Sequence, residues 1–98
     1  IMILVSYDIS SNRLRGKIAK KLEDYGVRIQ YSVFECDLSP KRYERLYGEL
    51  AEMTIGIKDG SIRFYEICAS CQKKMRLIGS RQPLNSVVSD RGDGIIVY

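Results

Sequence analysis

One carboxylate near the start of the sequence has the position of a ligand-binding group. Asp8 directly follows the apolar run of residues 2–7, and a polar stretch, Ser10 to Asn12, comes after it. A short, β-branched apolar run that ends in a polar turn predicts a strand buried on both faces, with Asp8 at its end. Ligand-binding groups collect at such ends, because the loop is exposed while the strand holds it rigid. An Asp here can equally form the turn or cap the next helix.

Basic side chains are densest just after Asp8. The next segment carries the cations Arg13, Arg15, Lys17, Lys20 and Lys21. The whole chain has 16 Lys and Arg against 12 Asp and Glu, a formal net charge of +4, which is only mildly basic. A solvated helix face explains such a run of charge, and so does a rim that binds the phosphates of a nucleic acid.

The sequence contains three cysteines, Cys36, Cys68 and Cys71, and no histidine. Without histidine, no Ser-His or Cys-His nucleophile pair can form, so hydrolysis would need carboxylates and a hard cation. An odd number of cysteines argues against a disulfide framework. One Cys-x-x-Cys pair and one further cysteine fall short of the four ligands of a closed zinc site. Packing in or beside strands is the simplest explanation, and an intermolecular zinc site and a redox pair remain open.

Hydrophobic periodicity predicts the elements that position Asp8 and the basic segment. Residues 12–25 are expected to form a helix whose apolar side chains recur at steps of three and four. The buried stripe consists of Leu14, Ile18, Leu22 and Tyr25. Residues 27–38 then read as two strands with a break near Ser32.

The second half of the chain repeats the alternation of helix and strand. Ser39 and Pro40 begin a helix, as the N-cap and the first helical residue, and this helix runs to Met53 with a structural role. After a turn at residues 58–61, residues 62–67 alternate as a strand. The order strand, helix, strand, strand, helix, strand predicts a ferredoxin-like α+β fold, in which two helices cover one face of an antiparallel sheet.

Length and the uncovered sheet face predict how this domain is completed. The 98 residues, 45% of them hydrophobic, form a small core, so we expect one domain over residues 1–78 and an extension over residues 79–98. A second copy should cover the open sheet face, and the apolar residues 95–98 should pair with a sheet edge of that copy. No apolar run is long enough for a membrane span and no signal-peptide pattern is present, so we expect a cytoplasmic location.

Three stretches of the sequence resemble a known family. They are residues 4–11 (LVSYDISS), residues 12–15 (NRLR) and above all residues 24–35 (DYGVRIQYSVFE). Over residues 2–78 the chain is similar to the small CRISPR-associated adaptation proteins of the Cas-two family. The resemblance implies a ferredoxin-like homodimer that works with the larger CRISPR integrase subunit during spacer capture. Several family members are described as metal-dependent endonucleases on RNA or DNA.

By this resemblance, Asp8 is the catalytic and metal-binding carboxylate, with Mg²⁺ or Mn²⁺ as the ion. The side chains expected at the nucleic acid are Arg13, Arg15, Lys17 and Arg28. Tyr7 and Phe34 take supporting positions. Lys17 stands where some relatives have Arg, so a bidentate phosphate grip becomes a point-charge contact there.

Two hypotheses follow for the function. In the first, two copies of Asp8 face each other across a dimer axis and hold one ion, because a single carboxylate is a poor Mg²⁺ site. The protein is then a metal-dependent phosphodiesterase on RNA or DNA. In the second, the dimer binds the backbone of duplex DNA as an assembly protein without cleaving it, and its apolar tail docks the integrase subunit. Duplex DNA and single-stranded RNA are thus the nucleic acids that the two hypotheses name. An RNA-recognition sheet is disfavoured because its stacking motif is missing, and Phe34 and Tyr65 are expected in the core.

Overall fold

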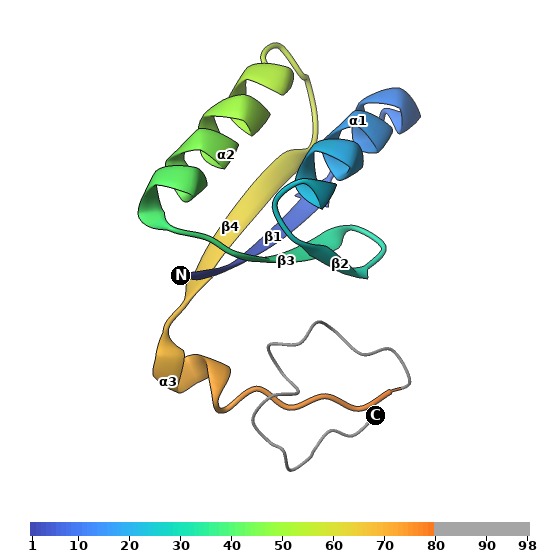
Figure 1. The fold of residues 1–98 in the computed structure, drawn as a ribbon. Coiled ribbons are helices and arrows are strands. Elements are labelled where there is room, and N and C mark those ends of the chain that lie inside the picture. Colours follow the sequence, from blue (N-terminus) through green and yellow to red (C-terminus); the bar gives the residue numbers. More distant parts are fainter. Residues whose placement is uncertain (80–98) are drawn as a thin grey trace.

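The computed structural model describes residues 1–79 and has two layers, a sheet with α1 and α2 packed on one of its faces (Figure 1). The strands are β1 (Met2–Asp8), β2 (Val27–Gln30), β3 (Val33–Asp37) and β4 (Ser61–Ile67). The helices are α1 (Asn12–Glu23), α2 (Pro40–Met53) and the short α3 (Ala69–Gln72).

The sheet is antiparallel, in the order β2-β3-β1-β4. β1 lies in the interior, and its Val5 pairs with Phe34 of β3 on one side and with Phe64 of β4 on the other. A turn at Tyr31 and Ser32 separates β2 from β3, at the break that the sequence predicts. This arrangement confirms the predicted ferredoxin-like fold with both long helices on one face.

Local signals explain where the two long helices begin and end. The Ser11 hydroxyl accepts a hydrogen bond from the Leu14 backbone N–H at 3.1 Å, and Ser39 caps α2 in the same way. These caps satisfy amides that the first turn of a helix leaves without partners. α1 ends at Glu23, two residues before the predicted end. The chain then turns at Gly26, where a Cβ atom would lie 2.2 Å from the Glu35 carbonyl oxygen, so that only glycine allows this approach to β3.

The core lies between the helices and one face of the sheet. The fully buried side chains that fill it include Ile3, Val5, Ile18, Leu22, Phe34, Cys36, Leu46 and Leu50. Of the predicted stripe on α1, Ile18 and Leu22 are buried, while Leu14 and Tyr25 pack at the edge of the core. Burial of these side chains is the main term that stabilises the fold.

The other face of the sheet is more open than the sequence predicts. Leu4 and Ser6 of β1 are half-buried and Asp8 is exposed, so the expectation of a strand buried on both faces is wrong for this stretch. Tyr65, expected in the core, is 48% exposed because it pairs with Leu4 on this face. The reason is that α1 and α2 both lie on the opposite face.

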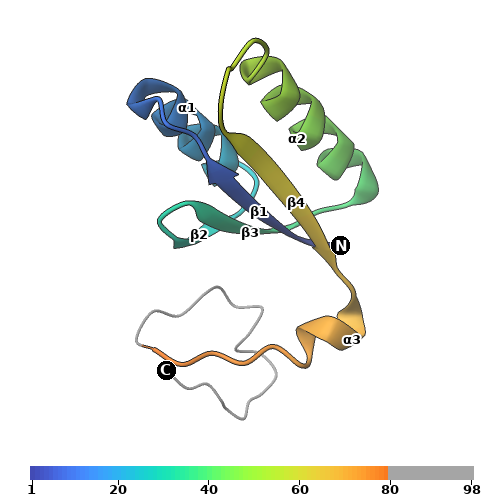
Figure 2. The same ribbon diagram turned by 180° about the vertical axis from the view of Figure 1, so that it is seen from behind.

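α3 leaves the end of β4 and lies on the side of the sheet away from α1 and α2 (Figure 2). The predicted terminal strand at residues 95–98 lies outside the described residues, as does nearly all of the extension at residues 79–98. No helix within residues 1–79 is long and apolar enough to span a membrane.

Candidate functional site

Asp8 ends β1 on the sheet face opposite to the two long helices. Pairing with β4 places it beside Ser61, and the alternation of side chains along β1 puts Ser6 on the same face. A shallow hollow of about 240 Å³ lies here and is lined by Ser6, Asp8, Ser61, Arg63 and Tyr65. We call it the Asp8 hollow.

The Asp8 carboxylate has no structural partner in the described part of the chain. It is exposed, and it makes no hydrogen bond or ion pair with any residue from 1 to 79. The alternative of a helix cap is wrong, because Ser11 is the N-cap of α1 and its hydroxyl makes the capping bond. The carboxylate is therefore open to a ligand.

A glycine that the sequence analysis did not single out positions the backbone of Asp8. Gly60 has φ +106°, and a Cβ atom there would lie 2.5 Å from the Asp8 carbonyl oxygen. Both features require glycine, because other residues rarely adopt this φ and their Cβ would collide with β1. The Asp59-Gly60 pair is typical of a turn, and this pair is the feature of the sequence from which the role of Gly60 could have been predicted.

The groups in the Asp8 hollow have the chemistry that Mg²⁺ and Mn²⁺ prefer, but they are few. Asp8 offers a carboxylate, and Ser6 and Ser61 offer hydroxyl oxygens. Nowhere in residues 1–79 do three His, Cys, Asp or Glu side chains gather closely enough to hold an ion. Hard oxygen donors fit these ions. The missing oxygens would have to come from water, from a nucleic acid or from a second copy of the chain.

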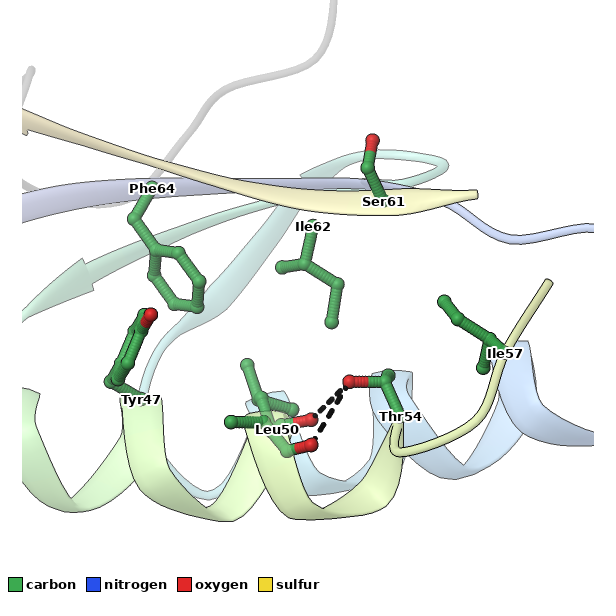
Figure 3. Close-up of a pocket in the computed structure, with 8 residues that line it drawn as sticks. Tyr47, Leu50, Thr54, Ile57, Ser61, Ile62 and Phe64 are labelled. Carbon is green, nitrogen blue, oxygen red and sulfur yellow. Dashed lines mark hydrogen bonds between the residues drawn. The ribbon is translucent and has the colours of Figure 1, made fainter. Parts of the chain in front are cut away.

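A second hollow, of about 290 Å³, lies between α2 and β4 and is mostly apolar (Figure 3). Ile62 and Phe64 point from β4 toward α2, whereas Ser61 points away from α2 (Figure 3). The hydroxyl of Thr54, the residue after α2, donates a hydrogen bond to the Leu50 carbonyl oxygen at 2.9 Å. The residues that line this hollow carry no charge, so we assign it no chemical role. The direction of the Ser61 side chain places its hydroxyl on the same sheet face as Asp8.

Several predicted site residues meet on the other side of the sheet, in a groove of about 330 Å³ between α1 and β2. Its lining is Tyr7, Asn12, Arg15, Gly16, Ala19, Arg28 and Tyr31. We call it the basic groove. Successive side chains of a strand point to opposite faces, so Tyr7 and Asp8 diverge although they are neighbours in sequence. The structure thus brings Tyr7, Arg15 and Arg28 together and leaves Asp8 apart from them.

The floor of the basic groove is a set of stacked side chains. The Arg28 guanidinium carbon lies 5.3 Å from the ring centroid of Phe34, and Arg28 Nη2 donates to the Tyr7 hydroxyl at 3.4 Å. The rings of Tyr7 and Phe34 lie 6.4 Å apart, and the Tyr7 hydroxyl donates to the Tyr31 carbonyl at 3.5 Å. Phe34 is fully buried. It therefore holds the Arg28 cation in place and cannot itself contact a ligand.

Arg15 links the basic groove to the loop that follows Asp8. Its Nη1 donates to the carbonyls of Ile9 at 2.6 Å and Ser10 at 3.3 Å, and its Nη2 donates to the Asn12 side-chain oxygen. The sequence predicts a phosphate contact for Arg15. The structure instead uses several of its five N–H donors to fix the loop, although its charge still faces the groove.

The basic residues of α1 divide into paired and unpaired ones. Arg13 and Lys17 are exposed, and neither makes an ion pair or hydrogen bond with residues 1–79. Lys21, in contrast, lies 3.6 Å from Glu49 of α2. Tyr25 donates to the same carboxylate at 2.8 Å, and this bond together with Lys21 and Arg45 lowers the pKa of Glu49. The last turn of α1 therefore joins the two helices, whereas Arg13 and Lys17 keep unpaired charges within residues 1–79.

The sheet order and the two covering helices make this chain a ferredoxin-like α+β protein, a class with many functions. The family is shown by a further comparison. The family model of CRISPR associated protein Cas2 matches residues 1–75. The chain belongs to this family, which confirms the resemblance seen in the sequence.

Relatives of known name agree with this assignment. The CRISPR-associated endoribonuclease Cas2 1 of Chloroflexus aurantiacus is 44% identical over 80 residues, which are 82% of this chain and 86% of the relative. The crystal structure of Streptococcus pyogenes Cas2 at pH 6.5 superposes with a TM-score of 0.70 and 33% identity, over 81% of this chain and 100% of that one. A chain of a partial Cas6-RT-Cas1–Cas2 complex gives a TM-score of 0.67 and 28% identity, over 76% of this chain and 87% of that one.

Proposed function

We propose that this protein is the nucleic-acid-binding subunit of a CRISPR adaptation complex, in which a homodimer works with an integrase subunit. The observation that carries the proposal is the pattern of charge on α1 and in the basic groove. Arg13 and Lys17 are exposed and unpaired within the described chain, and Arg28, which lines the groove, is fixed on Phe34. Support for the partner is that a similar chain comes from a complex whose name includes Cas1.

The cations of α1 that have no partner in the described part of the chain form a stripe along the helix. Arg13, Lys17 and Lys20 are all exposed and follow one another at steps of four and three residues, so they share one face of the helix. A stripe of this kind attracts the sugar-phosphate backbone without reading bases. Binding to duplex DNA or single-stranded RNA should therefore be independent of sequence and should weaken steeply with salt.

A second function, metal-dependent cleavage of phosphodiester bonds, is favoured by the Asp8 carboxylate, which has no partner among residues 1–79. The relatives that are named endoribonucleases support it. The Asp8 carboxylates of the two protomers would together hold Mg²⁺ or Mn²⁺, and the hydroxyls of Ser6 and Ser61 would orient water. A bound ion of this type activates water and neutralises charge on the phosphate. The Arg63 guanidinium, which lines the same hollow, would stabilise the phosphate oxygens as charge builds on them.

One set of measurements tests both functions. Labelled duplex DNA and single-stranded RNA are titrated with the protein at several salt concentrations, and their cleavage is followed with Mg²⁺, Mn²⁺ or chelator. The variants are Asp8→Asn, the double variant Arg13→Gln with Lys17→Gln, and Asp59→Asn. The last is a matched control, since Asp59 is also an exposed carboxylate near this end of the sheet and accepts a bond from Ser10.

The two functions predict separate outcomes. Asp8→Asn should keep or slightly strengthen binding, because a negative charge is removed, and should lower metal-dependent cleavage at least about 100-fold, as loss of a metal-binding or charge-stabilising group does. The double variant should weaken binding of every sequence. Unchanged binding by the double variant would contradict the binding function, and equal cleavage by wild type and Asp8→Asn would contradict the nuclease. A monomer in sedimentation at micromolar concentration would contradict both.

A further inference from the structure

Two exposed cysteines occupy the point where the chain leaves the sheet. Cys68 directly follows β4 and is the N-cap residue of α3, and Cys71 lies within that helix. Both are free thiols at the surface, whereas the third cysteine, Cys36, is fully buried in β3. Cys71 is three residues after Cys68 on this short turn, and the two side chains are hydrogen-bonded to each other.

The surroundings of the two thiols make them unequal. Cys68 Sγ lies 3.3 Å from the Ser70 hydroxyl oxygen. Hydrogen bonds from Ser70 and from Cys71 lower the pKa of Cys68 to about 7, and the bond to Cys68 raises the pKa of Cys71. Burial raises the pKa of Cys36 to about 11. At neutral pH, about half of Cys68 is therefore thiolate. Its neighbour Cys71 is a protonated thiol, and the buried Cys36 is unreactive.

We propose that Cys68 and Cys71 form a reactive thiol pair that takes small disulfides, of the glutathione class, and closes to a disulfide across α3. The Cys68 thiolate attacks one sulfur of the small disulfide, which gives a mixed disulfide and releases one thiolate. Cys71 then loses its proton to water, attacks the Cys68 sulfur and releases the second thiolate. Two cysteine thiols are oxidised and one small disulfide is reduced to two thiols.

The place of the pair in the fold gives the reaction a structural consequence. α3 joins β4 to residues 73–79, which lead to the rest of the chain. The Gln72 side chain donates to the Ile67 carbonyl at 3.2 Å, and the Gln72 N–H donates to the Cys68 carbonyl at 3.0 Å, so the turn is already tied to the strand end. A disulfide would add a covalent tie to this turn and fix the direction in which the chain leaves the sheet.

The test exposes the full-length protein to glutathione disulfide at pH 7, followed by acid quenching, intact mass measurement and peptide mapping. Wild type should become lighter by two hydrogens, with the bond mapped to Cys68 and Cys71. Cys71→Ser should accumulate one glutathione adduct on Cys68. Cys68→Ser should react about fourfold more slowly, because the larger thiolate fraction of Cys68 is partly offset by the lower nucleophilicity of a low-pKa thiol. Cys36→Ala is the matched control and should behave as wild type.

A second measurement separates a tuned pair from two ordinary surface thiols. The rate of alkylation of Cys68 by iodoacetamide is measured against pH in wild type and in Cys71→Ala. The midpoint should lie near pH 7 in wild type and should rise in the variant, where the hydrogen bond from Cys71 is lost while the larger contribution, the bond from Ser70, remains. Stable glutathione adducts on both cysteines of wild type, or a midpoint that the variant leaves unchanged, would overturn the proposal. Both positions are exposed, so an unchanged melting temperature should confirm that the variants fold.

Discussion

The basic groove and the Asp8 hollow lie on opposite faces of one sheet and are built in different ways. In the groove, each predicted side chain contacts another: Arg28 lies over Phe34, and Tyr7 is bonded to Arg28. In the hollow, the Asp8 carboxylate meets no partner among residues 1–79. Side chains that hold one another give a surface a fixed shape and charge, whereas an unpartnered carboxylate can bind a ligand directly. The groove therefore holds charge in a fixed position, and the hollow leaves a carboxylate open to a ligand.

This difference changes how loss of activity should be interpreted. Tyr7 and Asp8 are adjacent in sequence, yet they serve opposite faces. A variant of Tyr7 or Phe34 that lowers activity would act through packing, since Phe34 is buried and Tyr7 is only 3% exposed. Arg15 is the connection between the two regions, because it belongs to the groove and bonds the two carbonyls that follow Asp8.

The largest effect is expected for Phe34→Ala. Phe34 is fully buried under the groove, so its truncation should lower the free energy of unfolding by about 3–5 kcal/mol. The matched variant Tyr65→Ala, on the open face, should cost well under half as much because Tyr65 is 48% exposed. Urea denaturation followed by circular dichroism measures both. Equal losses would mean that the open face is as well packed as the groove floor.

The second effect concerns the hollow and compares two glycines. Gly60 and Gly56 both have positive φ, +106° and +85°, but only at Gly60 would a Cβ meet the Asp8 backbone, at 2.5 Å. Gly56→Ala should lower the free energy of unfolding by about 1 kcal/mol through backbone strain. Gly60→Ala should lower the free energy of unfolding by about 1–3 kcal/mol more than Gly56→Ala does, because its Cβ would also be forced against the Asp8 backbone.

Cleavage provides an independent readout for the same pair of variants. Because Gly60→Ala displaces the end of β1, it should also impair any metal-dependent cleavage that depends on Asp8, at a temperature where the variant is folded. Gly56→Ala should leave cleavage unchanged. Equal effects of the two variants on stability and on cleavage would show that Asp8 is not positioned by this contact.

The third effect tests the link between the two regions. Arg15→Met removes the bonds to the Ile9 and Ser10 carbonyls and should lower the free energy of unfolding by about 1–2 kcal/mol, since bonds from a charged donor are stronger than neutral ones. Lys17→Met, which deletes the same charge from an exposed position of α1, should change stability by less than about 0.5 kcal/mol. Thermal unfolding compares them. If Arg15→Met also lowers cleavage more than Lys17→Met does, the loop carries the effect to Asp8.

Local signals in the sequence predict the frame of both regions, while contacts between distant residues decide their details. The strand that ends at Asp8 and the cap at Ser39 depend on neighbours in sequence, and the structure confirms them. The contact of Arg28 with Phe34 depends on the pairing of β2 with β3, whose register shifts after Arg28. A pattern of residue types does not contain that shift. The exposed position of Tyr65 was missed for a related reason, since alternation along β4 defines two faces but not which one the helices cover.

The smallest effect is expected for Arg28→Met, and it separates charge from packing within the groove. Loss of one phosphate contact should weaken binding of all sequences by about 0.5–1 kcal/mol and reduce the slope of log K against log salt by about 1 per chain. The matched control is Arg42→Met, because the Arg42 guanidinium lies 4.6 Å from the Tyr25 ring centroid in an equivalent stacking contact but outside the groove lining. Both variants lose a similar cation–π interaction, so their stabilities should fall by similar amounts. Only Arg28→Met should change the salt dependence of binding. Arg28 lines the groove where we expect the phosphate backbone to bind, whereas Arg42 lies outside it.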